Sequence, residues 1–374
     1  MARNISASKK LAKIAACSNK KKWKNSCMAF LHEEIIFNIL TWLPAEVLLN
    51  VMRYVCQQWY NIIHDPLFIT THLHRAKAGL LIQNIRHPYS AHFVDVGGGD
   101  INSSKVKLRF PGKIMASHDG LLLFRDAKDD QILHVANPIT KKWVTLPPFN
   151  VTYKIASLKC GLACIPSTKE YKVLLSCKDE KNNRHCLIVT VGINNAWRLV
   201  DTKHVCEAAL LTLDFFPRSV GGFAIWAFHE NPYVLTLDVE AEIIHQLSVP
   251  RSCESKICVY LVMGSFLSFI TGHDSKLKME VWVLTDFERG EWTKLYKIDL
   301  EDERLMLEST FYPNVELHPV AWLNHGELVI FRVPRRQRHF VAHNVKTGQT
   351  KFVEIDYDIN RHIKRVHVES LVSW

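Results

Sequence analysis

The chain has 374 residues, of which 48% are hydrophobic and 22% are charged. This composition is ordinary for a folded protein and excludes a wholly disordered chain. The length suits a short module followed by one large domain better than a single small core. The most apolar stretch, Leu261 to Ile270, is too short to cross a bilayer, so we expect a soluble, intracellular protein without a membrane partner.

The formal charge of +10 is unevenly distributed. Residues 1–28 hold eight lysines and arginines and no acidic residue, which leaves +2 for the rest of the chain. The nearly balanced body of the protein argues against a nucleic-acid partner. We interpret residues 1–28 as a basic, disordered arm; a nuclear-import signal and an organellar presequence are the alternatives.

Residues 29–75 have the pattern of short amphipathic helices. Apolar residues recur at helical spacing from Ile35 to Leu43, and Pro44 is expected to end that helix. A second helix is predicted from Leu48 to Ile63, ending at the Asp65-Pro66 turn. So small a unit cannot bury its apolar faces alone. It therefore needs either a neighbouring domain or a partner protein.

Residues 79–374 follow a different, strand-rich pattern. An apolar strand, a polar turn and a second strand recur in residues 132–148, 186–199, 233–250, 281–300 and 340–355, and a further copy is expected within 79–111. Six copies in 296 residues average about 49 residues each, close to a kelch-like propeller blade. The segment from Val366 to Trp374 is predicted to close the ring on the first blade. An irregular array of β-sandwiches is the alternative.

The helical segment contains a characteristic order of residues. It runs from Leu31 to Leu40, continues through Trp42-Leu43-Pro44 and Leu48-Leu49 to Arg53–Tyr60, and ends on Asp65-Pro66-Leu67-Phe68. This order resembles the F-box family, in which such a unit seats its apolar face on a SKP-type adaptor that joins it to a cullin. The family's contact positions fall here on Leu31, Ile35, Leu43, Pro44, Leu48, Leu49, Val55 and Trp59. Two departures are His32, where the family usually has proline, and one extra residue between Leu49 and Val55.

The strand-rich region carries short motifs in a matching order: residues 119–123, 137–143, 171–173, 280–283, 292–294 and 369–372. They resemble the F-box-associated domains of plant F-box proteins. The resemblance implies a mainly β protein, with a short N-terminal helical F-box (residues 29–75) followed by a kelch-like β-propeller of about six blades (residues 79–374).

The same resemblance implies a function in ubiquitin ligation. The chain would be the non-catalytic, substrate-recognition subunit of an SCF-type (SKP adaptor–cullin–F-box) ubiquitin ligase in the nucleus or cytoplasm. Its propeller would bind an unidentified substrate protein or a glycan. The alternative is a propeller scaffold whose degenerate F-box acts without the cullin. A carbohydrate-binding or hydrolytic propeller is a third interpretation, which requires carboxylates and aromatics clustered on one rim.

Residues that carry catalytic or metal-binding chemistry form no recognisable motif in the sequence. We expect no metal, no cofactor and no catalytic residue, and we interpret His72 and His74 as surface residues. Ten scattered cysteines suggest reduced, mostly buried thiols. Four tryptophans near the ends of the expected blades are predicted to pack between blades: Trp143, Trp197, Trp282 and Trp292. The substrate-binding residues remain unknown, although a basic cluster at residues 335–339 would favour an acidic or phosphorylated substrate if it faced the recognition rim.

Overall fold

The computed structural model describes residues 32–84, 90–94, 106–109, 112–149, 158–250, 258–272, 277–336, 339–354 and 362–374. The basic arm at 1–28, Leu31, the triple glycine at 97–99 and part of the basic cluster at 335–339 lie outside these ranges. The chain divides into two compact units, Met1–Ala76 and Lys77–Trp374. No helix among the described residues is long and apolar enough to span a membrane.

The first unit is helical. Its elements are α2 (Glu33–Leu40), α3 (Ala45–Asn50), the 3-10 helix η2 (Met52–Tyr54), α4 (Gln57–His64) and α5 (Pro66–Arg75). Pro44 separates α2 from α3, as predicted, and stands at the N-cap of α3. The predicted second helix is wrong in its continuity, because Val51 leaves helical geometry (φ −131°, ψ −57°) and the chain makes three short pieces in place of one.

The Asp65-Pro66 pair both ends α4 and starts α5. The Asp65 carboxylate accepts hydrogen bonds from the backbone N–H groups of Leu67 (2.8 Å) and Phe68 (3.2 Å), and Pro66 occupies the first turn. The α5 helix in turn delivers His72 into the small core, where a ring nitrogen lies 2.8 Å from the carbonyl oxygen of Leu43. The interpretation of His72 as a surface residue is therefore wrong, because its buried side chain joins α5 to the α2–α3 turn. His74 is exposed, as predicted.

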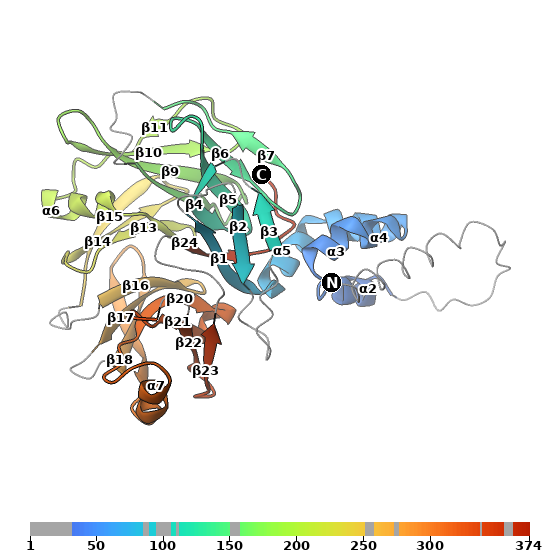
Figure 1. Cartoon of the computed structure of the whole chain (residues 1–374). Coiled ribbons are helices and arrows are strands. Elements are labelled where there is room, and N and C mark those ends of the chain that lie inside the picture. Colours follow the sequence, from blue (N-terminus) through green and yellow to red (C-terminus); the bar gives the residue numbers. More distant parts are fainter. Residues whose placement is uncertain are drawn as a thin grey trace. The chain divides into compact units, whose positions relative to one another are not determined.

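The second unit consists of six four-stranded antiparallel sheets, and the mainly β, six-bladed propeller is confirmed (Figure 1). The first blade combines β24 (His362–Val368), β1 (Ala78–Asn84), β2 (Ser90–Val94) and β3 (Val106–Arg109). The second blade has β4 (Gly112–His118), β5 (Leu121–Asp126), β6 (Leu133–Ala136) and β7 (Trp143–Thr145). The third has β8 (Lys159–Cys164), β9 (Tyr171–Lys178), β10 (Arg184–Thr190) and β11 (Arg198–Leu199).

The remaining three blades repeat the same order from the inside outward. The fourth contains β12 (Arg218–Val220), β13 (Phe223–Ala227), β14 (Tyr233–Asp238) and β15 (Ile243–Ser248). The fifth contains β16 (Cys258–Met263), β17 (Phe266–Gly272), β18 (Lys278–Asp286) and β19 (Glu291–Asp299). The sixth contains β20 (His318–Leu323), β21 (Leu328–Arg332), β22 (His339–Asn344) and β23 (Thr350–Glu354). Within the described ranges of the propeller, short helices occur in connections: α6 (Glu207–Leu210), η4 (Leu211–Asp214), α7 (Arg304–Thr310) and η5 (Asn324–Gly326).

Each repeat predicted from the sequence corresponds to the two outer strands of one blade. In four blades the turn between those strands is fixed by a side chain that accepts hydrogen bonds from backbone N–H groups two and three residues further on. Asn137, Asp238, Asp286 and Asn344 all do this. Whether the blades are related to kelch repeats stays a prediction.

The ring closes through the last strand of the chain. β24 pairs antiparallel with β1, so the first blade takes its innermost strand from the C-terminal part of the chain, as predicted (Figure 1). The predicted bounds are wrong, because the strand spans His362–Val368 and not Val366–Trp374. Residues that follow β24 form hydrogen bonds with the second blade. The Asn137 side-chain amide donates to the carbonyl oxygens of Ser370 (3.0 Å) and Val372 (2.8 Å), and the Ser370 hydroxyl donates to Asp119 O (2.6 Å). Gly120 (φ +83°) is required beside Ser370, because a Cβ there would lie 2.1 Å from Ser370 Oγ.

Two buried tryptophans join neighbouring blades. The indole N–H of Trp226 on β13 donates to the hydroxyl of Ser176 on β9 (2.8 Å). Trp322 on β20 makes the same bond to Ser268 on β17 (2.9 Å). Both indoles lie in apolar clusters that fill the space between adjacent blades. Neither was predicted, whereas the predicted Trp143 is 59% exposed and stacks on His134 instead, so its assignment to packing between blades is wrong.

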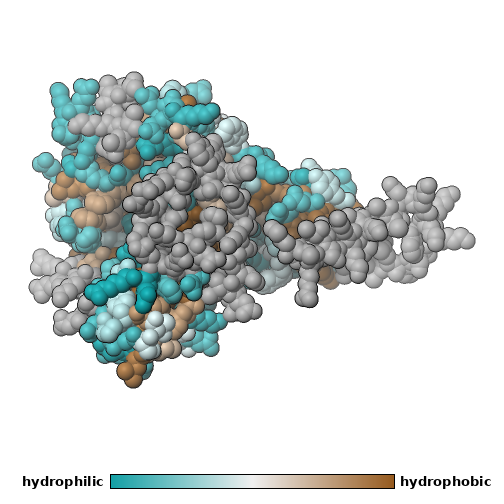
Figure 2. All heavy atoms as spheres, in the orientation of Figure 1, coloured by the Kyte–Doolittle hydropathy of each residue, from teal (hydrophilic) through white to brown (hydrophobic). Residues whose placement is uncertain are grey.

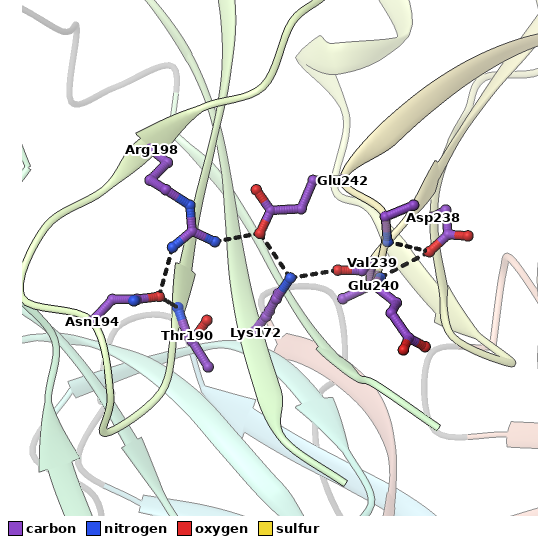
Figure 3. A network of polar contacts seen from close by, with 9 residues as sticks. Lys172, Thr190, Asn194, Arg198, Asp238, Val239, Glu240 and Glu242 are labelled. Atoms are coloured by element: carbon purple, nitrogen blue, oxygen red, sulfur yellow. Dashed lines mark hydrogen bonds and ion pairs between the residues drawn. The ribbon is translucent and has the colours of Figure 1, made fainter. Parts of the chain in front are cut away.

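A polar network also joins the third and fourth blades (Figure 3). The ammonium of Lys172 on β9, whose side chain is only 7% exposed, donates to Glu242 Oε1 and to Val239 O, both at 2.7 Å. Arg198 on β11 binds the same carboxylate from the other side. Glu242 lies in the β14–β15 turn, so one carboxylate from the fourth blade pairs with two cations of the third.

A second ionic group lies between the third blade and the connection that follows it. Asp214 in η4 accepts hydrogen bonds from Lys178 (2.8 Å) and from Arg184 (2.8 and 3.1 Å), which flank the β9–β10 turn. Burial tends to raise the pKa of Asp214, but the hydrogen bonds and charges of Arg184 and Lys178 outweigh it and hold the pKa below its ordinary value. The carboxylate thus stays ionised and fixes η4 to the blade.

Candidate functional site

The helical unit exposes more apolar surface than its size explains. Ile35 and Ile39 on α2 are 47% and 49% exposed, and Trp42, just beyond the end of α2, is 74% exposed. These three residues are spaced at i, i+4 and i+7, so they share one face of the helix. Hydrophobic surface on the helical unit is visible in Figure 2.

The exposed face continues on the residues that follow α3. The side chains of Val51, Tyr54 and Val55 are all more than one-third exposed. Arg53 packs its guanidinium 4.7 Å from the centre of the Tyr54 ring, and Arg75 lies 4.9 Å from the centre of the Trp42 ring. Exposed apolar side chains accompanied by cations are typical of a protein-binding surface. We call the six residues Ile35, Ile39, Trp42, Val51, Tyr54 and Val55 the apolar face.

The residues expected to contact an adaptor have different positions in the structure. Ile35 and Val55 belong to the apolar face, and Pro44 is exposed at the start of α3. The half-buried members of the expected set are Leu43, Leu49 and Trp59. Leu31 lies outside the described residues.

Leu48 does not have the exposure that a contact residue needs. Its side chain is 0% exposed and belongs to the core of the helical unit, with Ile36, Leu40, Ile62 and Ile63. It supports the apolar face from behind and offers no surface to a partner in this conformation.

Sequence reasoning missed Ile39, Trp42, Val51 and Tyr54. The first two carry a readable signal, because they continue the helical spacing that begins at Ile35. Val51 and Tyr54 carry none, since their exposure follows from the break between α3 and α4, which the sequence did not indicate.

The two departures from the F-box pattern have mild structural consequences. His32 precedes α2 with φ −56° and ψ 142°, a backbone geometry that proline also adopts. The extra residue between Leu49 and Val55 lies in the stretch that contains η2. Neither departure disturbs α2 or the core beneath the apolar face.

The described part of the propeller contains no group of three or more side chains arranged to hold a metal ion. Seven cysteines lie among the described residues, and burial raises the pKa of Cys160 and of Cys177 to about 12. A thiol with so high a pKa is a poor nucleophile. Only three of the seven are fully buried, fewer than expected.

The fold defines a two-part protein, with a helical unit that exposes an apolar face and a six-bladed β-propeller. The family model described as the F-box associated beta propeller domain matches residues 84–372. The chain belongs to this family.

Similar proteins of Arabidopsis thaliana carry F-box names. F-box protein At5g49610 is 26% identical over 292 residues, which cover 73% of this chain and 80% of that protein. F-box protein CPR1 is 22% identical over 309 residues, covering 72% of this chain and 73% of that protein. F-box protein At5g65850 is 23% identical over 280 residues, covering 70% and 69%. These matches therefore cover 70–73% of this chain and 69–80% of each relative.

Proposed function

We propose that this protein is the non-catalytic, substrate-recognition subunit of an SCF-type ubiquitin ligase. The helical unit (residues 29–75) binds a SKP-type adaptor, and through it a cullin, while the propeller (residues 79–374) binds the protein destined for ubiquitination. The apolar face carries this proposal, because a small unit with Ile35, Ile39 and Trp42 exposed on one side needs a partner groove to bury them. The names of the relatives support the same assignment.

The adaptor contact in this proposal uses exposed residues. Ile35, Val55 and Pro44 keep the role that the family resemblance implies, and Leu43, Leu49 and Trp59 contribute their exposed edges. Ile39 and Trp42 are added to the set, and Leu48 supports it from the core. Leu31 keeps its expected role on the family resemblance alone.

The propeller is the substrate-binding part in this proposal. Connections at the ends of its strands vary in length and sequence without disturbing the blades, which suits recognition of a protein or a glycan. We place the protein in the nucleus or cytoplasm, with residues 1–28 as a solvated arm.

The alternative function is a propeller scaffold that acts without a cullin. His32 and the extra residue before Val55 favour it, because both depart from the pattern of adaptor-binding F-boxes. The backbone at His32 weakens this argument. Its φ of −56° is one that proline also adopts, so α2 begins in the same way with either residue.

The test is co-expression of the full chain with a SKP-type adaptor, followed by affinity capture and size-exclusion chromatography. We expect a stoichiometric complex that also recruits the cullin. A folded chain that repeatedly elutes without the adaptor, with a propeller that melts cooperatively, would instead support the scaffold. Co-purified substrates identified by mass spectrometry would then name the target.

A further inference from the structure

Four cations stand on the innermost strands of four consecutive blades. They are Arg365 on β24, Lys113 on β4, Lys159 on β8 and Arg218 on β12. Every blade is antiparallel with four strands, so the chain enters each innermost strand at the same end of the ring. Lys113, Lys159 and Arg218 occupy the first or second position of their strands. Arg365 lies further along β24, and its guanidinium donates to the carbonyl oxygen of Met115 on the neighbouring inner strand β4 (3.1 and 3.3 Å).

Phe216 shows that two of these cations meet at the axis of the ring. The Lys159 ammonium lies 5.2 Å from the centre of the Phe216 ring, and the Arg365 guanidinium lies 5.3 Å from it. Phe216 precedes β12 of the fourth blade, whereas Arg365 belongs to the first blade. The first and fourth blades are opposite each other in a six-bladed ring, so a contact between their residues crosses the axis. We call Lys113, Lys159, Arg218 and Arg365 the axial cations.

The axial cations repel one another. Burial, and then the charge of Arg218, lowers the pKa of Arg365 to about 10. The pKa of Lys113 is lowered by burial and next by the charges of Arg125, Lys159 and Arg365. Such shifts mean that like charges lie close together in a partly desolvated place.

Three of the four axial cations have no carboxylate paired with them in the described part of the chain. No carboxylate among the described residues forms an ion pair with Lys113, Lys159 or Arg218. The nearby Asp130 is already paired with Arg125 (3.3 Å). An arrangement of several cations that face one point destabilises the empty protein and becomes favourable when an anion binds between them.

We propose that the axial cations form a binding site for a tetrahedral oxyanion of the phosphate class. Three or four donors from different blades match the several oxygen atoms of such an anion, and lysine and arginine are the side chains that bind phosphate in proteins. The Phe216 ring forms one wall and holds two of the cations in place. The anion is either a free phosphate compound or the phosphorylated side chain of a bound protein segment.

If the anion is a phosphorylated side chain, the site extends the proposed function, because the recognised substrate is then a phosphorylated protein. This extension rests on that function, whereas binding of inorganic phosphate does not. A chain that binds phosphate at the axis but never captures the adaptor would retain the site and refute the ligase. A chain that captures the adaptor and does not bind phosphate would support the ligase function and refute the phosphate site.

The experiment uses the full chain and inorganic phosphate or pyrophosphate as probes, titrated at constant ionic strength with chloride as the reference. Affinity is followed by isothermal calorimetry and stability by thermal unfolding. The variants are Lys113→Gln and Lys159→Gln, and the control is Lys346→Gln. Lys346 is ion-paired with Glu327 in the β22–β23 turn, at the other end of the ring.

We expect phosphate to raise the Tm of the wild type and of the Lys346→Gln control equally. Each axial variant should bind phosphate at least about tenfold more weakly. Each should also melt at a higher temperature than the wild type without phosphate, because one repelling charge has been removed. An unchanged Tm of the wild type in phosphate, or an equal phosphate effect in axial and control variants, would overturn the site.

A pair of peptide pools that differ only in phosphorylation of their serines distinguishes the sources. Phosphopeptides that bind more tightly than inorganic phosphate, and that phosphate displaces, identify the ligand as a modified protein. Phosphopeptides that fail to compete with phosphate identify a free oxyanion. Equal capture of phosphorylated and unphosphorylated pools, insensitive to added phosphate, would count against the site as a phosphate receptor.

Discussion

The double variant Ile35→Ala and Ile39→Ala tests the apolar face directly. Both side chains lie on the exposed side of α2 and are about half exposed, so truncating them should leave the helical unit folded. Fully burying an isoleucine side chain contributes about 1.5–3 kcal/mol. A partner that covers the exposed half of each one gains about 1 kcal/mol per residue, or about 2 kcal/mol for the pair. The double variant should therefore bind the adaptor roughly 30-fold more weakly.

The assay is a titration of adaptor against the purified full chain, with a thermal melt of each variant beside it. A matched control truncates two exposed apolar residues of the propeller, Ile243→Ala and Leu305→Ala, which are 52% and 81% exposed. We expect the control to bind the adaptor like the wild type. Undiminished binding by the double variant would refute the assignment of the apolar face. Equal losses in the double variant and the control would refute it as well.

The other predictions concern stability. Leu48→Ala should destabilise the helical unit by about 2–5 kcal/mol and abolish adaptor binding through unfolding, seen as lost helical circular dichroism. Trp226→Phe leaves a buried hydroxyl without its donor and should cost about 1–3 kcal/mol in thermal or denaturant unfolding, whereas Trp143→Phe should change little. Glu242→Gln should destabilise the propeller by a similar amount, because two cations lose their shared carboxylate, and a denaturant melt checks it. Asp214 has a lowered pKa, so its contribution is present above its ordinary pKa of 3.8 and is lost as pH falls through the folded value; Asp214→Asn should flatten that acid loss in pH-dependent melts.

In the helical unit, the features predicted correctly from the sequence are those that depend on neighbouring residues alone. Pro44 and the Asp65-Pro66 pair mark helix ends by removing a backbone donor or supplying a cap, and the structure has helix ends at both places. The break at Val51 lies in a stretch without glycine or proline, so no local signal announced it. Such a break is decided by how α3 and α4 pack, which depends on residues distant in the sequence.

In the propeller, the predicted repeats were the outer strand pairs because their turns carry asparagine or aspartate at a fixed place. Asn137 and Asn344 are examples. The inner pairs lack such a marker, and their near-continuous burial hides the alternation of a half-exposed strand. The buried Trp226 was missed for this reason, whereas Trp143 in an outer strand was overrated.

The axial cations illustrate a signal that exists in the sequence but has no meaning until the strands are placed. Lys113, Lys159, Arg218 and Arg365 are separated by tens of residues and belong to no motif. Only the closure of the ring by β24 turns one position per blade into neighbours around a single axis. A propeller can therefore assemble a charged site from isolated residues, because each blade has only to supply one side chain at the same level. Blade-by-blade comparison of the first few residues of the inner strands is thus the search that finds such sites.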